Sequence, residues 1–272
     1  MERLELTENY ELLEEIPDYG FSGRMDLKEI YIPKSVRKIG KYAFYNCRDL
    51  KKITFYSSLF DIGSGAFTGC HHIRELDITM LNDHYACLKE IVQELTEELT
   101  VQIRGKEEAK LVFPEYFEEG IENTPARLIN HQVHGSGMKY RNCLYKKEIK
   151  YAEYDACFSW AKDIENPETI QKMVLARLRY PIQLQALAKK AYETYAREYL
   201  VDMGKKLVRE NDVEGLVWIL EKYLESNAQI EDILEEASKK EAVECVSVLM
   251  NLRKDRFVKG KTRGIPDFDF DF

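Results

Sequence analysis

The sequence predicts an α+β fold, in which a short β-solenoid of about three 23-residue repeats precedes a β-hairpin and an α-helical C-terminal region. Three observations support this prediction: self-similarity at a step of 23 in the first 80 residues, two alternating apolar segments near residue 100, and helical periodicity from residue 151. We expect four parts: repeats with an N-terminal cap at 1–80, a linking segment at 81–150, a helical repeat-like domain at 151–256 and a disordered tail at 257–272.

Composition and charge exclude or disfavour several classes of protein. With 44% hydrophobic and 32% charged residues the chain is globular, which excludes a wholly disordered protein. The net charge of −8 argues against a nucleic-acid coat protein. No apolar stretch approaches the ~20 residues of a membrane helix, and the acidic N-terminus lacks the pattern of a secretory signal. Six cysteines without a CxxC motif favour reduced thiols, so we expect a cytoplasmic protein.

The repeat is visible when residues 16–38, 39–61 and 62–79 are written as three rows. Each row ends in an apolar-x-x-apolar-x-apolar unit, whose last three positions alternate as a short strand with one buried face does. Every matching column steps by 23. The clearest columns are Ile16, Ile39 and Ile62; Phe21, Phe44 and Phe67; Gly23, Asn46 and Gly69; and Ile30, Ile53 and Leu76.

Cys47 and Cys70 share one of these columns, which predicts stacked core positions because cysteine is among the most buried residue types. A zinc site that joins Cys70 to His71 and His72 is disfavoured, since three contiguous residues cannot all face one ion without strain.

The rows resemble the BspA-type leucine-rich repeat in Ile32-Pro33, Ile39-Gly40 and Ala43-Phe44. The resemblance covers about residues 10–80. The first row departs from it, with Arg24 in the cysteine column, and we expect it to form an N-terminal cap with helix-like residues 3–15. The family implies a curved solenoid that binds macromolecules, usually proteins, through one face of its strands. In this sequence the corresponding residues are Glu29, Tyr31, Lys52, Thr54, Glu75 and Asp77.

The middle segment predicts an amphipathic helix within 81–98 and a β-hairpin that pairs 99–104 with 110–113. Residues 115–143 have no regular pattern, although Thr124-Pro125 is typical of a helix start.

A glycine-rich turn at 134–137 suggests a second candidate site, because such backbone can direct N–H groups at an anion. It fits neither a Walker loop nor a nucleophile elbow, and a plain structural loop is the alternative. His131, His134, Cys143 and Cys157 do not follow a known zinc spacing, and no catalytic motif is present; we expect no catalytic residues, metal or cofactor. The possible ligand or anion site comprises Asn123, Arg127, His134, Gly135, Ser136, Gly137 and Arg141.

The C-terminal half is predicted to form successive helices. Residues 211–220 and 241–250 are similar in sequence, which is an internal echo, or weak repeat, at a step of 30. The echo resembles ankyrin-type helix pairs without the TPLHxA turn of that family; a generic amphipathic bundle is the alternative. The terminal DFDFDF segment is either an inert tail or a short docking peptide. The expected helices are 151–162, 167–178, 182–198, 201–210, 213–225, 229–239 and 241–252.

These features favour a non-catalytic interaction module or scaffold that binds a protein partner through its repeat surfaces. One alternative is an anion or nucleic-acid binder that uses the basic block 24–52, with tyrosines interleaved among its nine basic residues. The other is an enzyme with a site near 123–141.

Overall fold

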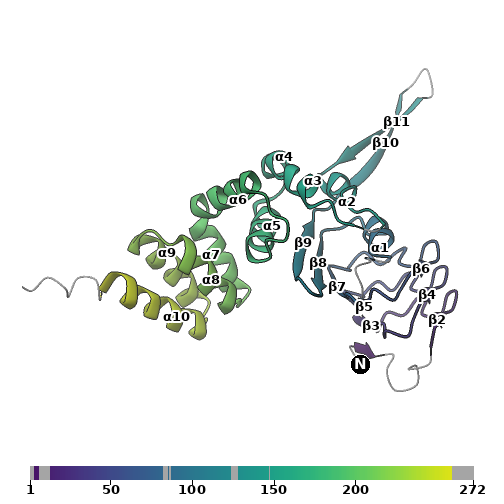
Figure 1. Ribbon diagram of the computed structural model, residues 1–272, viewed down its shortest axis with the longest axis horizontal. Coiled ribbons are helices and arrows are strands. Elements are labelled where there is room, and N and C mark those ends of the chain that lie inside the picture. The colour runs from purple at the N-terminus through teal and green to yellow at the C-terminus, as the bar shows by residue number, and fades with distance from the viewer. Residues whose placement is uncertain are drawn as a thin grey trace, which may run out of the picture. The chain divides into compact units, whose positions relative to one another are not determined.

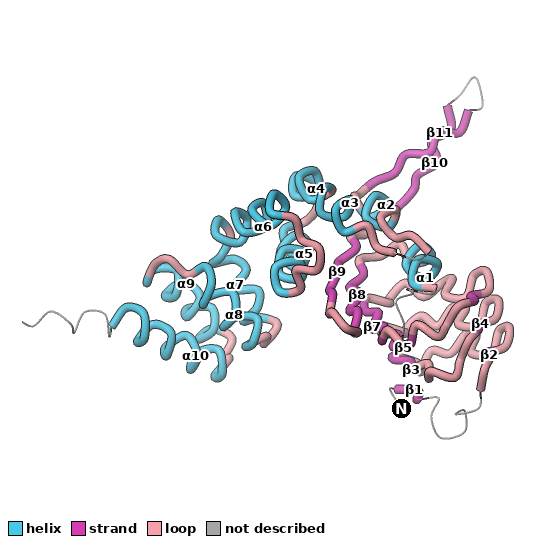
Figure 2. The backbone as a smooth tube through the Cα atoms, viewed as in Figure 1, coloured by secondary structure: helices cyan, strands magenta, loops and turns pink. Residues whose placement is uncertain are grey.

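The computed structural model describes residues 3–5, 13–81, 85, 87–123, 128–146 and 148–258, and it falls into two units, 1–189 and 190–272 (Figures 1 and 2). Among the described residues, the first unit holds the strands and the helices α1 to α5, and the second holds α7 to α10. Helix α6 (Ala186–Glu198) spans the boundary between them.

A sheet of six strands in the order β1-β3-β5-β7-β8-β9 forms the body of the first unit (Figure 1). Each pair is parallel except the last, and Ile30 lies opposite Ile53, which lies opposite Leu76, as the 23-residue step predicts. A second parallel sheet, β2-β4-β6, runs along another side of the coils. The strands are β1 (Arg3–Glu5), β2 (Glu15–Ile16), β3 (Glu29–Tyr31), β4 (Lys38–Ile39), β5 (Lys52–Tyr56), β6 (Asp61–Ile62), β7 (Glu75–Thr79), β8 (Leu99–Arg104) and β9 (Ala109–Phe113).

Successive coils stack identical side chains in the core. The rings of Phe21, Phe44 and Phe67 form a column with centroids 5.3 Å apart and planes within 4° of parallel. The thiol of Cys47 donates a hydrogen bond of 3.0 Å to the carbonyl oxygen of Phe21, and the thiol of Cys70 donates an equal one to Phe44. The predicted ladder is therefore confirmed, and the two cysteines belong to its buried interior.

The corners of the coils also repeat at a step of 23. Tyr19 and Tyr42 have φ of 58° and 54°, and Asn46 has φ of 57°. Glycines occupy this left-handed conformation in the neighbouring coils, because a residue without Cβ adopts it without strain. The Tyr19 and Tyr42 rings stack at 5.3 Å, so the strained tyrosines gain a contact between coils.

The solenoid extends to about four coils, one more than the three rows predicted. Strand β8 pairs in parallel with β7, with Thr100 opposite Glu75, so the last step is 25 residues rather than 23. Helix α1 (Leu88–Glu94) occupies this coil, and it is shorter than the predicted range. The predicted hairpin is confirmed, with Val101 opposite Leu111 on the antiparallel strand β9.

Two local predictions were wrong. Residues 3–5 form a strand that pairs with β3 instead of a helix, because the open edge of the ladder offers backbone partners. The described residues of 115–143 are largely regular: β10 (Phe117–Asn123) and β11 (Leu128–His134) form an antiparallel hairpin that projects from the unit, followed by α2 (Gly137–Arg141) (Figure 1). The predicted helix start at Thr124 and Pro125 lies outside the described residues.

Three helices complete the first unit: α3 (Tyr151–Ala156), α4 (Phe158–Ile164) and α5 (Pro167–Arg179). The single helix expected at 151–162 is broken at Cys157. Asn166 caps α5 through a hydrogen bond of 2.9 Å from the Thr169 amide to its side chain, with Pro167 at the first helical position.

The second unit repeats a helix pair at a step of 30. The loops before α8 and α10 contain Asn211 and Glu241, both with φ of 54°. The next amides, of Asp212 and Ala242, donate to the carbonyls of Leu207 and Ala237 at 2.9 and 3.0 Å. The helices are α7 (Leu200–Arg209), α8 (Val213–Tyr223), α9 (Asn227–Lys239) and α10 (Val243–Arg253), followed by a π-helix (Lys254–Val258).

Within the described part of the chain, none of the helices is both long and apolar enough to cross a membrane. The DFDFDF segment lies outside the described residues, and of the expected tail only Phe257 and Val258 are described, at the end of the π-helix.

Candidate partner-binding face

We use the term strand face for the side of the main sheet that points away from the stacked core. Its side chains alternate along β3, β5, β7 and β8 with buried residues such as Ile53 and Val101. Strand pairing aligns them in rows across the sheet. One row contains Glu29, Lys52, Glu75 and Thr100, and the next contains Tyr31, Thr54, Asp77 and Gln102.

All six residues that the sequence pointed to therefore lie on one continuous surface. Glu29 and Glu75 are exposed, and the other four are half-buried by their neighbours. They share one surface for two reasons. Side chains alternate between the two faces of the sheet along each strand, and equivalent residues of neighbouring strands are 23 positions apart.

Charged side chains on the strand face are paired across adjacent strands. Lys52 Nζ lies 3.3 Å from Glu75 Oε2. The guanidinium of Arg104 donates to both carboxylate oxygens of Asp77, with Nε to Oδ1 at 3.0 Å and Nη2 to Oδ2 at 3.1 Å, and this pairing raises the pKa of Arg104. Such fork-like pairs fix the geometry of both partners.

An aromatic pair lies on the same face. The hydroxyls of Tyr31 and Tyr56 share a hydrogen bond of 2.6 Å, and their rings meet edge to face at 6.0 Å. Tyr56 and Arg104 were missed by the sequence reasoning, although continuing the alternation of β5 and β8 by one more step would have found them. The face thus combines fixed charges with two ordered phenols.

A comparison with models of protein families supports the repeat architecture that positions the strand face. Residues 13–89 match the BspA type leucine rich repeat region in six copies. This segment is a BspA-type leucine-rich repeat. No curated protein and no solved structure matches the chain significantly.

The second candidate site lies outside the leucine-rich repeat, and its arginine is engaged internally. Arg141 is 1% exposed. Burial lowers the pKa of Arg141 to about 10. Its guanidinium donates to five backbone carbonyls from α1, the following loops and α2, at 2.5 to 3.1 Å. The accepting residues are Val92, Leu95, Glu97, Pro114 and Gly137.

The glycine-rich turn also makes internal contacts. The Ser136 amide donates to Glu165 Oε1 at 2.6 Å, so the anion at this turn is a carboxylate of the chain itself. His134 ends β11, stacks on Phe117 at 4.6 Å and lies 3.3 Å from Glu119.

The other members of that candidate set are dispersed or not described. Asn123 ends β10, at the far end of the hairpin from His134, which pairs with Phe117. Gly135 has φ of 82°, and Gly137 begins α2. Arg127 lies outside the described residues. A ligand at 123–141 stays a prediction, and internal contacts already account for Arg141 and the turn.

The basic block 24–52 is partly neutralised by acidic neighbours. Arg24 pairs with Asp26 at 2.6 Å, which lowers the pKa of Asp26 to about 2. Lys38 lies 2.7 Å from Glu15, and this contact raises the pKa of Lys38. Together with Lys52, at least three of the nine basic residues face carboxylates, which weakens the block as a phosphate-binding surface.

Among the described residues, no group of three or more His, Cys, Asp or Glu side chains is placed to hold a metal ion.

Proposed function

We propose that the chain is a non-catalytic interaction module whose strand face binds a protein partner. The observation that carries this proposal is the ordered row structure of the face, in which Tyr31 is joined to Tyr56 and Arg104 to Asp77. Side chains that are already held in place lose less conformational entropy when a partner binds. The leucine-rich repeat of residues 13–89 supports the same function, because stacked repeats present extended binding surfaces.

The chemistry of the face favours a folded or extended protein over a polyanion. Positive and negative groups are interleaved, and tyrosine and arginine are among the residues enriched at energetically important interface positions. We propose a partner surface that presents both donors and acceptors, with an apolar group against the Tyr31–Tyr56 pair.

We further propose a cytoplasmic location, which agrees with the six cysteines, all of them free thiols. For the second unit we propose ankyrin-like helix pairs, on the support of the 30-residue step shared by Asn211 and Glu241. These pairs would extend the scaffold.

The test uses the full chain as bait in extracts of its source cells. Thr54→Arg places a bulky cation at the centre of the strand face, between Tyr31 and Asp77. Thr194→Arg is the matched control, because Thr194 is exposed on α6 outside the strand face. We expect proteins retained by the native chain and by T194R to be lost from T54R, with equal melting temperatures for both variants.

Retention of the same proteins by T54R would show that the strand face does not bind them. RNA that binds the native chain with a steep salt dependence, and equally well to T54R, would instead favour the nucleic-acid alternative.

A further inference from the structure

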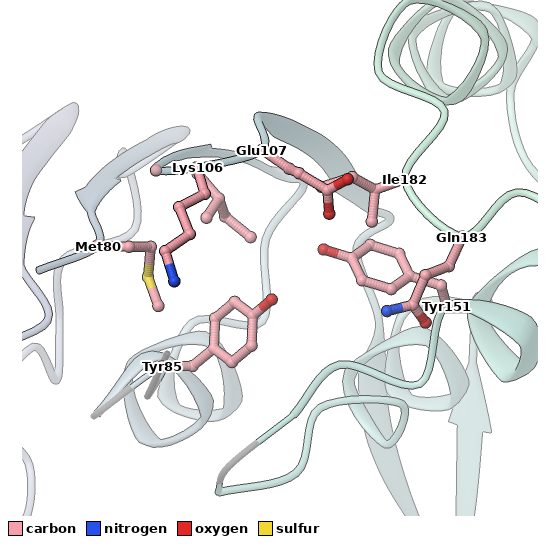
Figure 3. A pocket seen from close by; sticks show the side chains of 9 residues that line it. Met80, Tyr85, Lys106, Glu107, Tyr151, Ile182 and Gln183 are labelled. Atoms are coloured by element: carbon pink, nitrogen blue, oxygen red, sulfur yellow. The ribbon is translucent and has the colours of Figure 1, made fainter. Parts of the chain in front are cut away.

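A pocket of about 190 Å³ lies beside the turn between β8 and β9, within the first unit (Figure 3). It is formed where the last coil of the solenoid meets α3 and the loop after α5. Its volume corresponds to about six waters at ~30 Å³ each, and it is smaller than the ~300–1,000 Å³ of pockets for drug-sized ligands. Its occupant is therefore a small molecule.

One wall contains a buried hydroxyl whose hydrogen-bonding capacity the described residues leave largely unused. Tyr151, at the start of α3, is 2% exposed; its hydroxyl has no well-formed hydrogen bond to a described residue, and the polar side chain that interacts with it is Tyr85. Figure 3 shows this hydroxyl pointing into the pocket. Burial raises the pKa of Tyr151, and the nearby Tyr85 adds to the increase, so the hydroxyl is neutral at pH 7 and can donate or accept. A buried hydroxyl whose hydrogen-bonding capacity is largely unused is costly, which points to a ligand that satisfies it.

The wall around Tyr151 is rigidly built. The guanidinium of Arg177 lies 5.1 Å from the Tyr151 ring centroid and is fully buried. It donates to both carboxylate oxygens of Asp155, at 2.8 and 2.9 Å. It also donates to the carbonyls of Tyr180 and Ile182 at 3.1 and 2.9 Å, which holds the loop that brings Ile182 and Gln183 to the pocket.

Opposite charges lie at separate places in the pocket. Figure 3 shows the Lys106 ammonium on the same side as Met80 and Tyr85, and the Glu107 carboxylate on the side of Tyr151. Ile103 and Ile182 add apolar surface to the lining. A small molecule with one negative and one positive end would match both sides at once.

We propose that this pocket binds a free α-amino acid. The ligand carboxylate lies toward Lys106 and the Tyr85 hydroxyl, the ligand ammonium lies toward Glu107 and the Tyr151 hydroxyl, and the ligand side chain contacts Ile103 and Ile182. This site is independent of the strand face, and nothing in the proposed partner binding requires it.

The first experiment adds an equimolar mixture of the twenty standard L-amino acids to the full chain and records saturation-transfer NMR. We expect a subset with small or apolar side chains to show transfer. The strongest binder is then titrated beside its N-acetyl and its amide derivatives. Because each derivative lacks one charge, we expect each to bind at least tenfold more weakly than the parent.

Variants assign the site. Tyr151→Phe removes only the hydroxyl and keeps the ring against Arg177, so we expect an unchanged melting temperature and an affinity at least threefold lower. Lys106→Met and Glu107→Gln should each weaken binding at least fivefold, and Lys162→Met, on the exposed side of α4, should leave it unchanged. Absence of transfer from every amino acid, equal affinity for parent and derivatives, or native affinity in both Y151F and K106M would overturn the proposal.

Discussion

The backbone amide of Phe67 donates a hydrogen bond of 2.9 Å to the side chain of Glu94. In the preceding coils the equivalent amides, of Phe21 and Phe44, donate to the carbonyls of Ala43 and Ala66 in the next coil. After Phe67 the chain forms α1 instead of another corner, so a carboxylate at the end of that helix replaces the missing carbonyl. Glu94 Oε1 also accepts from the Thr68 hydroxyl at 3.1 Å. It therefore caps the backbone ladder of the solenoid.

Replacing Glu94 with alanine is expected to destabilise the first unit by about 1–3 kcal/mol, since the Phe67 amide and the Thr68 hydroxyl lose their acceptor. Glu94→Gln is the matched control, because its amide oxygen can accept both hydrogen bonds. Urea unfolding should place E94Q close to the native protein and E94A well below it. Equal losses in both variants would mean that the charge, and not the acceptor, matters at this position.

The same cap has a defined pH dependence. Burial raises the pKa of Glu94 above its ordinary value of 4.5, although the hydrogen bonds from Phe67 and Thr68 oppose the increase. The folded state therefore binds this proton more tightly than the unfolded chain, and stability falls as pH rises from 4.5 through the folded-state pKa. Glutamine cannot titrate, so the stability of E94Q relative to the native protein should increase over this window and level off above it. A difference that is independent of pH between 4 and 8 would contradict this assignment.

Phe44 occupies the centre of the aromatic column and contacts a ring on each side. Phe44→Ala is expected to cost about 3–5 kcal/mol, because it removes a fully buried ring and leaves a cavity. Phe21→Ala should cost less, since Phe21 is half-buried and, among the described residues, stacks on the ring of Phe44 alone. The measurement is urea unfolding of both variants. If F21A were as destabilised as F44A, stacking within the column would not be the cause.

Much of this solenoid is readable from the sequence because the same contact recurs at a fixed step. Ile30, Ile53 and Leu76 align in the sequence and also pair in the sheet. The fourth coil breaks the step, since helix α1 replaces the corner and Glu94 replaces the carbonyl ladder. This replacement of a corner by a helix and a side chain depends on tertiary packing, so no local sequence pattern predicts it. The hairpin of β10 and β11 was missed because Gly120 and a run of acidic residues interrupt the alternation by which a strand is recognised.

The strand face was predictable to the same extent as the ladder. Its six residues follow from the repeat. The pairing of Arg104 with Asp77, in contrast, depends on a fourth coil that places the two side chains in contact. The pocket could not be predicted, because Tyr151 and Lys106 lie 45 residues apart and meet only through the packing of α3 on the last coil. The burial of Arg141 could not be predicted for a related reason: arginine is usually exposed, and its burial depends on carbonyls from two distant stretches, residues 92–97 and Pro114.

Gly63 shows how closely the coils approach each other. A Cβ at this position would overlap the backbone of Gly40 and Lys41 in the previous coil, which cannot move without changing the spacing of the ladder. Gly63→Ala should therefore cost about 3 kcal/mol or more. Gly23→Ala is the control, because Gly23 has φ of 74° with open space around it, so only backbone strain of about 1–2 kcal/mol is added. Thermal unfolding of both variants would detect the difference, and a smaller loss in G63A than in G23A would rule out steric contact between coils.

Arg141 is expected to act as a structural clamp. Arg141→Met leaves five carbonyls without their donor and should destabilise the first unit by at least about 3 kcal/mol, since hydrogen bonds from a charged group contribute about 1.5–3 kcal/mol each. Arg141→Lys keeps the charge, but three N–H groups on one nitrogen cannot reach acceptors in a planar fork, so its loss should be nearly as large. Arg48→Met, at an exposed corner, should change stability by less than about 0.5 kcal/mol. Urea unfolding separates these outcomes. If R141K unfolded like the native protein, the guanidinium would be available for a ligand, and the candidate site at 123–141 would regain its support.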